Sequence, residues 1–535
     1  MKYPVKHIIA SLTLLFLGNI GLLTAQEPSS SEAYHGTSRI IEVNMSSPTT
    51  SLSDQPLICV GAGRAHEGLM ANWQQQLTEI QKHCAFKYIR FHGLLHDDMG
   101  VFKMFNGHPQ YNFQYIDALY DFLLSVNIRP FVELSFMPHD LRSGDETVFW
   151  WKGNATPPSD YAQYKTLIKK LVTHLTERYG REEVKEWYFE VWNEPNYPAF
   201  FTGDIKDYFH MYQIAAEAIK EVDANYRVGG PATSGCGWVP QMIEFADSHH
   251  VALDFISTHT YGVEGALDEY GTMANFLRPD PMCIVNDIKE VRRQMKEANK
   301  GDMELHITEF NTSYSPRDPI HDTYQNATYL LNVMRYTPAF ATSMSYWTFT
   351  DIFEEAGTVD KPFHGGFGLI NWQDIRKPSF YAYAFYNQLY SKEIETKDTQ
   401  SWITTDGEGN LSMLIYDFTM PQQGKESNPV YFTQLHPAKH KGQVNLEINQ
   451  LQDGQYILEC QQVGYKQHDP QSMYLEMGKP DQLTLAQEKR LRQDAISVPT
   501  KTRIDVHKGS TTIKLDWLTN QFYLVRLIKV ITQKK

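Results

Sequence analysis

The sequence predicts an α/β chain in which a (β/α)8 barrel is followed by an antiparallel β-sandwich. From residue 56 to about residue 390, short apolar runs alternate with longer helical patterns, and eight such units fit this length. After Lys392 the apolar runs shorten and are separated by Gly, Asn, Asp and Pro, as is typical of antiparallel strands. The whole chain of 535 residues is also too long for one ordinary core.

Composition and charge narrow the class of protein. Aromatic residues make up 13% of the chain, which excludes disorder as the main state. The formal net charge is −14 and there is no long basic run, so we predict no nucleic-acid partner. The five cysteines lack CxxC spacing and predict neither a disulfide framework nor a zinc site.

The N-terminus has the pattern of a secretory signal. Lys2 and Lys6 precede an apolar run over residues 8–23, and the small residue Ala25 marks the expected cleavage point. A membrane anchor needs about 20 apolar residues, whereas this run is interrupted by glycines and Asn19. We therefore expect a secreted or periplasmic protein with no membrane insertion after cleavage.

The predicted organisation has four parts. They are a signal peptide (1–25), a linker with a leading strand (26–55), the barrel (56–391) and the sandwich (392–535). The leading strand, Arg39–Asn44, is expected to join the C-terminal sheet because chain ends often lie together.

Each barrel strand is predicted from a short apolar run. The expected strands are Leu57–Gly61, Tyr88–His92, Arg129–Leu134, Trp187–Trp192, Arg227–Gly230, Phe255–His259, Glu304–Glu309 and Ser345–Phe349. Between them lie amphipathic stretches, such as the one in which Leu167, Leu171 and Leu175 recur at helical spacing. The alternative, a doubly wound open sheet, usually carries a Gly-rich phosphate turn. The nearest match, Gly61–His66, lacks the third glycine.

The sandwich strands are predicted in the same way. They are Trp402–Thr405, Met413–Asp417, Val444–Ile448, Tyr456–Gln461, Thr511–Asp516 and Gln521–Ile528. A helical pattern over Pro480–Asp494 interrupts them.

Two glutamates stand at the ends of predicted barrel strands. Glu194 follows the fourth strand and Glu309 ends the seventh. In barrels of this kind the active site lies at the C-terminal ends of the strands, so both side chains can reach one pocket. Paired carboxylates are what glycoside hydrolysis requires, although barrel mouths also use carboxylates to bind metals.

Neighbouring polar and aromatic residues favour a sugar site. Strand alternation places Arg90 with His92, and His259 with Tyr261, on shared faces, and Trp347 on the eighth strand completes the set. The cation and the donors can keep Glu309 ionised while Glu194 keeps its proton. A metal site built from His92, His259 and His306 lacks HExxH-type spacing, so no metal and no cofactor are predicted. We expect Glu190 to pair with Arg90 inside the barrel rather than to act in catalysis.

These segments resemble glycoside hydrolase family 39, the β-xylosidase and α-L-iduronidase family. The resemblance rests first on Glu190–Asn196 and Ile307–Asn311. Cys59–Arg64, Ile89–Gly93, Phe131–Pro138 and Phe363–Leu369 are also similar to family segments, in the same order. The likeness runs through nearly all of the chain after Ala25.

The resemblance implies a retaining mechanism, with Glu194 as general acid/base and Glu309 as nucleophile. It also implies that His92, Asn193 and His259 bind the glycone. Tyr314 is expected to lie against the nucleophile. Of the adjacent pair Glu354 and Glu355, one is expected to bind sugar hydroxyls, and we assign Glu354.

The expected function is that of a secreted exo-glycosidase that releases β-D-xylose from the non-reducing ends of plant oligosaccharides. Two alternatives stay open: a glycosidase for arabinosyl or galactosyl side chains, and a non-catalytic carbohydrate-binding protein. An iduronidase is disfavoured, because Tyr261 offers no cation for a sugar carboxylate. A homo-oligomer and the role of the sandwich also stay open.

Overall fold

The structure is a computed structural model that describes residues 37–530. The predicted signal peptide lies outside the described residues. Among those described, no helix is both long enough and apolar enough to span a bilayer.

Eight parallel strands of the described chain close into a barrel, which confirms the predicted fold class. They follow chain order around the barrel: β3 (Cys59–Arg64), β4 (Tyr88–His92), β7 (Arg129–Glu133), β10 (Tyr188–Glu190), β11 (Arg227–Thr233), β12 (Phe255–Tyr261), β15 (Glu304–Asn311) and β16 (Ser343–Tyr346). Each overlaps the strand predicted for it.

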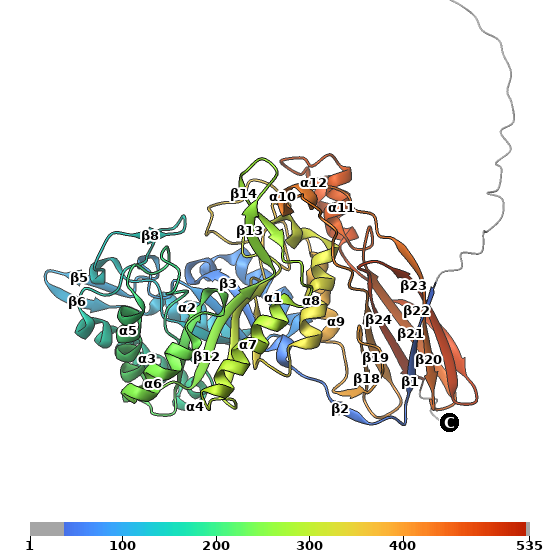
Figure 1. The fold of residues 1–535 in the computed structure, drawn as a ribbon, viewed down its shortest axis with the longest axis horizontal. Coiled ribbons are helices and arrows are strands. Elements are labelled where there is room, and N and C mark those ends of the chain that lie inside the picture. The colour runs from blue at the N-terminus through green and yellow to red at the C-terminus, as the bar shows by residue number, and fades with distance from the viewer. Residues whose placement is uncertain (1–36, 531–535) are drawn as a thin grey trace, which may run out of the picture.

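Helices surround the barrel (Figure 1). They are α1 (Ala71–Cys84), α2 (Gln114–Ser125), α3 (Tyr161–Tyr179), α4 (Arg181–Lys185), α5 (Ile205–Val222), α6 (Val239–His249), α7 (Cys283–Glu297), α8 (Tyr324–Tyr336) and α9 (Pro378–Tyr386). In α3, Leu167, Leu171 and Leu175 are buried, as their spacing predicts. The helix begins where the Asp160 carboxylate accepts hydrogen bonds from the backbone N–H groups of Ala162 and Gln163.

The barrel interior changes from apolar to charged along its axis. Tyr88, Phe131, Tyr188 and Phe255 form an aromatic cluster near the start of the strands. Two residues further along β4, Arg90 is buried among carboxylates. The packed cluster closes one end of the barrel, so the chemistry is confined to the other end.

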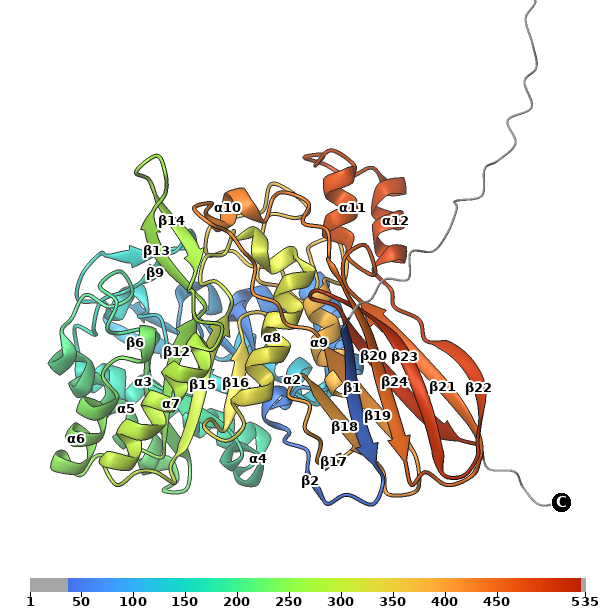
Figure 2. The ribbon, with the colours of Figure 1, turned by 45° about the vertical axis from the view of Figure 1, so that its right-hand side comes forward.

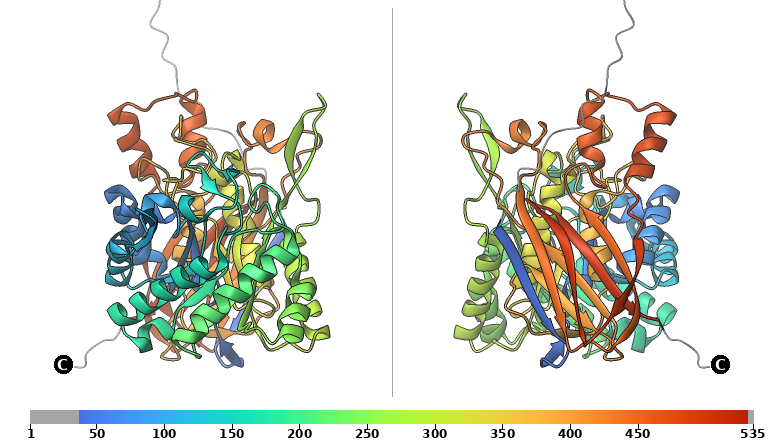
Figure 3. Two further views of the ribbon diagram at one scale, coloured as in Figure 1. Left: turned by 90° about the vertical axis from the view of Figure 1, so that its left-hand side faces the viewer. Right: turned by 90° about the vertical axis from the view of Figure 1, so that its right-hand side faces the viewer.

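The C-terminal region is a sandwich of two sheets (Figure 3, right). The smaller sheet contains β1 (Thr37–Asn44), β20 (His440–Asn449) and β23 (Ser510–Leu518). The larger contains β2 (Thr49–Ser51), β17 (Lys392–Ile394), β18 (Ser401–Thr405), β19 (Leu411–Tyr416), β24 (Phe522–Lys529), β21 (Gly454–Val463) and β22 (Thr500–Val506). The leading strand β1 pairs in parallel with β20, so it lies in the C-terminal sheet.

Some details of the sandwich differ from the sequence prediction. The helical segment is split into α11 (Pro470–Glu476) and α12 (Leu485–Asp494), and residues 480–484 are not helical. Strand β22 was not predicted because its sequence, TKTRIDV, has few apolar residues. As an edge strand it faces solvent, so it needs no apolar alternation.

The barrel and the sandwich share one core. Trp402 of β18 packs against Tyr386 of α9, with ring centroids 5.3 Å apart. Phe522 of β24 packs against Phe385 of α9 at 5.7 Å. The larger sheet is therefore covered on one face by barrel helices and on the other by the smaller sheet (Figure 2).

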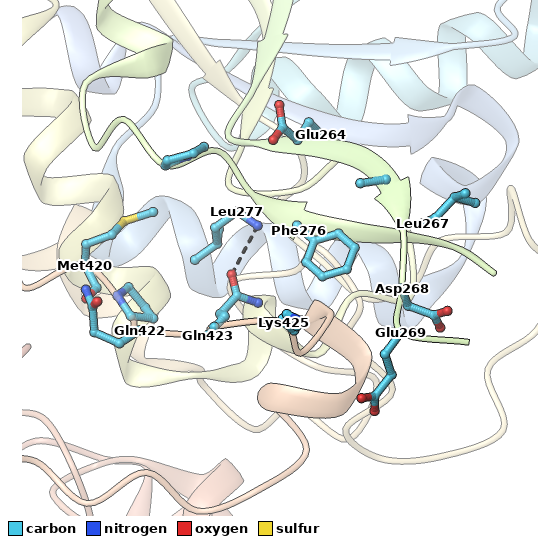
Figure 4. Close-up of a pocket in the computed structure, with 14 residues that line it drawn as sticks. Glu264, Leu267, Asp268, Glu269, Phe276, Leu277, Met420, Gln422, Gln423 and Lys425 are labelled. Carbon is cyan, nitrogen blue, oxygen red and sulfur yellow. Dashed lines mark hydrogen bonds between the residues drawn. The ribbon is translucent and has the colours of Figure 1, made fainter. Parts of the chain in front are cut away.

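Three hairpins extend from the barrel loops. They are β5 (Phe102–Phe105) with β6 (His108–Tyr111), β8 (Thr147–Val148) with β9 (Gly153–Asn154), and β13 (Val263–Leu267) with β14 (Met273–Leu277). The third hairpin lies beside residues 420–425 of the β19–β20 connection, which also contains α10 (Asn428–Tyr431) (Figure 4). The backbone N–H of Leu277 donates to Gln423 Oε1 at 3.2 Å. A surface hollow of about 770 Å³ lies between them and contains neither Glu194 nor Glu309.

Candidate active site

The two predicted glutamates lie together in the barrel mouth. A carboxylate oxygen of Glu194, a carboxylate oxygen of Glu309 and a ring nitrogen of His259 all lie within 4.8 Å of one another. Only 8% of Glu194 and 5% of Glu309 is exposed. Glu309 lies in β15 where the pairing with β12 and with β16 shifts register, and Glu194 follows the short strand β10 with a φ of 44°. This local bend turns the Glu194 side chain back toward the barrel axis.

Arg90 links the inner carboxylates of the barrel. Its Nη1 donates to Glu309 Oε1 at 2.6 Å, its Nε to Glu190 Oε2 at 2.7 Å and its Nη2 to Asn193 Oδ1 at 2.9 Å. Nη2 also lies 2.7 Å from Glu133 Oε2. The predicted pairing of Arg90 with Glu190 is therefore confirmed, and the guanidinium holds Glu309 as well.

Glu309 receives a hydrogen bond on each oxygen. Tyr261 donates its hydroxyl to Oε2 at 2.7 Å, while Arg90 occupies Oε1. Tyr314 lines the same cavity as Glu309, but its hydroxyl donates to Asn275 Oδ1 at 2.9 Å rather than to the nucleophile, and the residue is 48% exposed. Tyr261 holds that position because it continues strand β12, which pairs directly with β15.

Glu194 is in a different electrostatic environment. Burial, followed by the charge of Glu309, raises the pKa of Glu194 well above its ordinary value. Arg90 and His92 act in the opposite direction but do not outweigh these causes. A carboxyl group that keeps its proton at neutral pH, beside a carboxylate held by two donors, is the arrangement expected of an acid and a nucleophile.

Hydrogen bonding fixes the proton positions on His259. Thr308 donates its hydroxyl proton to Glu190 Oε1 at 2.8 Å, so its oxygen must accept from His259 Nε2 at 3.1 Å. Burial, with the nearby Arg90 and His92, lowers the pKa of His259 well below its ordinary value, so its ring is neutral. Nδ1 therefore carries no proton and accepts from the protonated Glu194, 2.8 Å away.

His92 is the second cation of the site. Burial lowers its pKa, but the charge of Glu133 and the hydrogen bonds of Glu133 and Glu355 outweigh burial and raise it to about 10. Its Nδ1 donates to Glu133 Oε2 at 2.7 Å, and its Nε2 faces Glu355 Oε1 at 3.4 Å. The ring stacks on Phe149 at a centroid distance of 5.7 Å.

The structure places Glu354, the expected sugar-binding residue, outside the cavity lining, whereas its neighbour Glu355 lines the cavity. Glu354 is drawn away from the cavity by Arg64, whose Nη2 donates to its Oε2 at 2.5 Å. Glu355, the other member of the predicted pair, lines the cavity.

The catalytic cavity has a volume of about 300 Å³. It is lined by His92, Phe149, Glu194, Tyr197, Phe200, Ser234, Tyr261, Glu309, Tyr314, Trp347 and Glu355. Asn193 lies just beneath, 1% exposed, and its Nδ2 has no hydrogen-bond partner among the described residues. Trp347 packs between His92, at 4.7 Å, and the Arg90 guanidinium, at 5.6 Å.

Several of these residues were missed in the sequence. Glu133 could have been found, because alternation on its strand places it inward with Phe131. Phe149, Tyr197 and Phe200 belong to loops and Ser234 begins a short 3-10 helix, so no periodic signal marks them.

Glu194, His259 and Glu309 have the geometry of a metal-binding group. The donor atoms of Glu309 and His259, however, are engaged by Arg90, Tyr261 and Thr308, and Glu194 is bonded to His259 Nδ1. Two cationic side chains, Arg90 and His92, adjoin the group. This donor set fits proton transfer better than cation binding. His306, the third histidine of the metal alternative, is far from the mouth and packs against Tyr188 and Phe255.

A parallel barrel with two carboxyl groups of opposite character at its mouth defines a glycoside hydrolase. Residues 39–510 match the family described as Glycosyl hydrolases family 39, and the chain belongs to this family. It is 41% identical over 372 residues to a β-xylosidase of Geobacillus stearothermophilus, covering 68% of this chain and 73% of the relative. A β-xylosidase of Caldicellulosiruptor saccharolyticus is 42% identical over 372 residues, 68% of this chain and 75% of the relative.

A solved structure has the same fold. The monomeric β-xylosidase from Caulobacter crescentus CB15 superimposes with a TM-score of 0.89 at 37% identity. The match covers 92% of this chain and all of that chain.

Proposed function

We propose that this chain is a secreted β-D-xylosidase that removes xylose from the non-reducing ends of oligosaccharides with retention of configuration. The observation that carries the proposal is the Glu194–Glu309 pair, with one carboxyl kept protonated and the other held by Arg90 and Tyr261. The named β-xylosidase relatives support the choice of sugar. The N-terminal signal pattern supports secretion.

The spacing of the pair supports the retaining route. Retaining glycosidases have carboxyl groups about 5–5.5 Å apart, whereas inverting enzymes leave room for a water at about 6.5–9.5 Å. One carboxylate oxygen of Glu194 and one of Glu309 lie within 4.8 Å of each other, which favours the retaining separation. Glu309 attacks the anomeric carbon while Glu194 protonates the departing oxygen. Glu194 then takes a proton from water, which releases the sugar.

The cavity supports exo action on a neutral pentose. Its volume of about 300 Å³ is at the small end of ligand sites and suits one sugar ring. Neither lysine nor arginine is among its lining residues, so a uronate would lack its usual partner. His92, the cation present, is already engaged by Glu133.

A panel of glycosides tests the substrate: aryl β-xyloside, α-arabinosides, α- and β-galactosides, β-glucoside and an iduronide. We expect the highest kcat/KM on the β-xyloside and, by proton NMR, β-xylose as the first product. Preference for an arabinoside or galactoside would change the assigned sugar and leave the assigned mechanism unchanged. Affinity without hydrolysis of any member would support the carbohydrate-binding alternative and refute the proposal.

Two substitutions test the assigned roles. Glu309→Ala should abolish turnover of every cleaved substrate. Glu194→Ala should lower kcat/KM for xylobiose by on the order of 10²–10⁴-fold, and far less for an aryl xyloside with a good leaving group, which needs little protonation. Normal turnover by Glu309→Ala, or an equal loss on both substrates for Glu194→Ala, would contradict the assignment.

A further inference from the structure

Glu67 is a buried carboxylate outside the catalytic cavity whose position the mechanism above does not explain. It lies in the short 3-10 helix Ala65–Leu69, directly after barrel strand β3, and is 0% exposed. Its Oε2 accepts from the backbone N–H of Arg64 at 3.2 Å. Its Oε1 accepts from the backbone N–H of Glu354, 287 residues away in the sequence, at 2.9 Å.

The Glu354 backbone is also the backbone that presents Glu355. The carbonyl of Glu355 accepts from the Trp150 N–H at 2.8 Å, and its side chain enters the cavity toward His92. Arg64 holds the Glu354 side chain on the outside. The segment is therefore tethered at adjacent residues, and its two glutamates point in opposite directions.

The residues around Glu67 leave space for its carboxyl group. A Cβ at Gly63 would lie 2.3 Å from Glu67 Oε2, so any larger residue there would displace it. The Arg64 guanidinium, over the Trp151 ring at 5.3 Å, closes the other side. Burial raises the pKa of Glu67 to about 8, because the Arg64 guanidinium and the two backbone donors offset only part of the desolvation cost.

We propose that Glu67 is a positioning residue that sets the sugar-binding geometry of Glu355 by holding the backbone of Glu354. The proposal rests on the proposed function, and it assigns to Glu355, which lines the cavity, the role of accepting a glycone hydroxyl. Glu67 itself touches neither the substrate nor the reacting atoms. Its effect is exerted on binding of the glycone ring, through one residue of backbone.

The test is a double-mutant cycle of Glu67→Gln and Glu355→Gln, measured as kcat and KM on the best wild-type substrate of the glycoside panel. Glu67→Gln keeps the shape but loses one backbone acceptor, so we expect KM to rise about tenfold with kcat nearly unchanged. Because Glu67 acts through Glu355, the double variant should be no worse than Glu355→Gln alone. Additive effects would overturn the proposal, as would an unchanged KM in Glu67→Gln.

Asp469→Asn is the matched control. Asp469 is also buried, and its carboxylate accepts from the backbone N–H groups of Lys466 and Ser472, but it lies in the C-terminal region, which contributes no residue to the cavity lining. It should lower Tm and leave KM unchanged. If Glu67→Gln does not fold, Glu354→Gln loosens the same segment from Arg64 and should raise KM in the same direction but less. Inactivity of the wild type on the whole panel would refute the proposed function, whereas additivity in an active enzyme would refute only the role of Glu67.

Discussion

Glu194 must act first as an acid and then as a base, and the charge of Glu309 provides the change between the two roles. Burial and that charge are the two largest causes that raise the pKa of Glu194. Once Glu309 is bonded to the sugar it carries no charge, so one of the two causes disappears. The pKa of Glu194 then falls, and the same side chain can accept a proton from water.

Glu309→Gln should reproduce this fall without substrate. We expect the pKa of Glu194, followed by carbon-13 NMR of its carboxyl, to drop while staying above the ordinary 4.5, because burial persists. Glu355→Gln is the comparison, because the Glu355 charge is a smaller cause in the same direction and its removal should produce a smaller drop. An unchanged pKa in Glu309→Gln would show that burial alone sets the value.

In the wild type, kcat/KM should fall as pH rises through the Glu194 pKa, since the acid is then deprotonated.

The hydrogen bond with Thr308 determines which ring nitrogen of His259 is unprotonated. Thr308→Val removes the acceptor from Nε2–H, so the ring should favour the tautomer whose Nδ1–H donates to Glu194. A donor to the carboxylate stabilises its charged form, so the basic limb of the kcat/KM profile should move down by roughly one pH unit. Thr258→Val is the control, because the Thr258 hydroxyl bonds the Thr233 carbonyl and not the catalytic histidine. Equal profiles for both variants would contradict the assigned tautomer.

The inner partners of the catalytic pair could be predicted from the sequence because regular strands fix side-chain direction, and the pair itself could be predicted from its place at the strand ends. Alternation brought Arg90, His92, His259 and Tyr261 to the correct faces. The choice between Glu354 and Glu355 could not be made in this way, since competition by Arg64 decides it and Arg64 is 290 residues away. Loop side chains take their direction from such distant contacts.

At the scale of elements, the β19–β20 connection supports the mouth of the cavity. Asn428 Nδ2 donates to Asp318 Oδ2 at 2.8 Å, in the loop that carries Tyr314. Phe432 is fully buried in a cluster with Val263 and Leu277 of the third hairpin. The C-terminal region therefore reaches the catalytic cavity without contributing a residue to its lining.

Asn428→Ala should affect the second sugar of the substrate more than the first. Loss of this buried hydrogen bond should loosen the loop of Tyr314, which is at the outer part of the cavity. We expect KM for xylobiose to rise about threefold to tenfold, with little change for β-xylosyl fluoride, which has no second ring. Asn445→Ala is the control, since Asn445 bonds Ser38 in the smaller sheet. Equal effects of Asn428→Ala on both substrates would show that the connection does not act on the outer part of the cavity.

The barrel strands could be predicted from the sequence. The contact between the third hairpin and the β19–β20 connection could not. Continuous apolar runs mark buried parallel strands, and all eight were located. The hairpin and the β19–β20 connection have mixed composition, because each covers only part of the other. Their pairing depends on contacts between segments about 150 residues apart, such as Leu277 with Gln423.

At the scale of the whole molecule, the barrel and sandwich are expected to unfold together. The side chains of Trp402, Tyr416 and Phe522 belong to the same apolar cluster as the barrel helices. The opposite face of that sheet packs on the smaller sheet. A sheet buried on both faces cannot leave the barrel without exposing the aromatic side of α9.

Trp402→Ala tests this coupling. Trp402 is 2% exposed, lies against Tyr386 and is covered by the Arg335 guanidinium at 5.4 Å. Removal of the indole should lower the free energy of unfolding by about 3–5 kcal/mol, because it leaves a void in the core that the barrel and the sandwich share. Calorimetry should give one transition at a lower Tm, with equal calorimetric and van't Hoff enthalpies for wild type and variant. Trp372→Ala, at a residue 41% exposed, should change stability by no more than about 0.5 kcal/mol. Two transitions, of which Trp402→Ala shifts only one, would mean that the sandwich folds independently of the barrel.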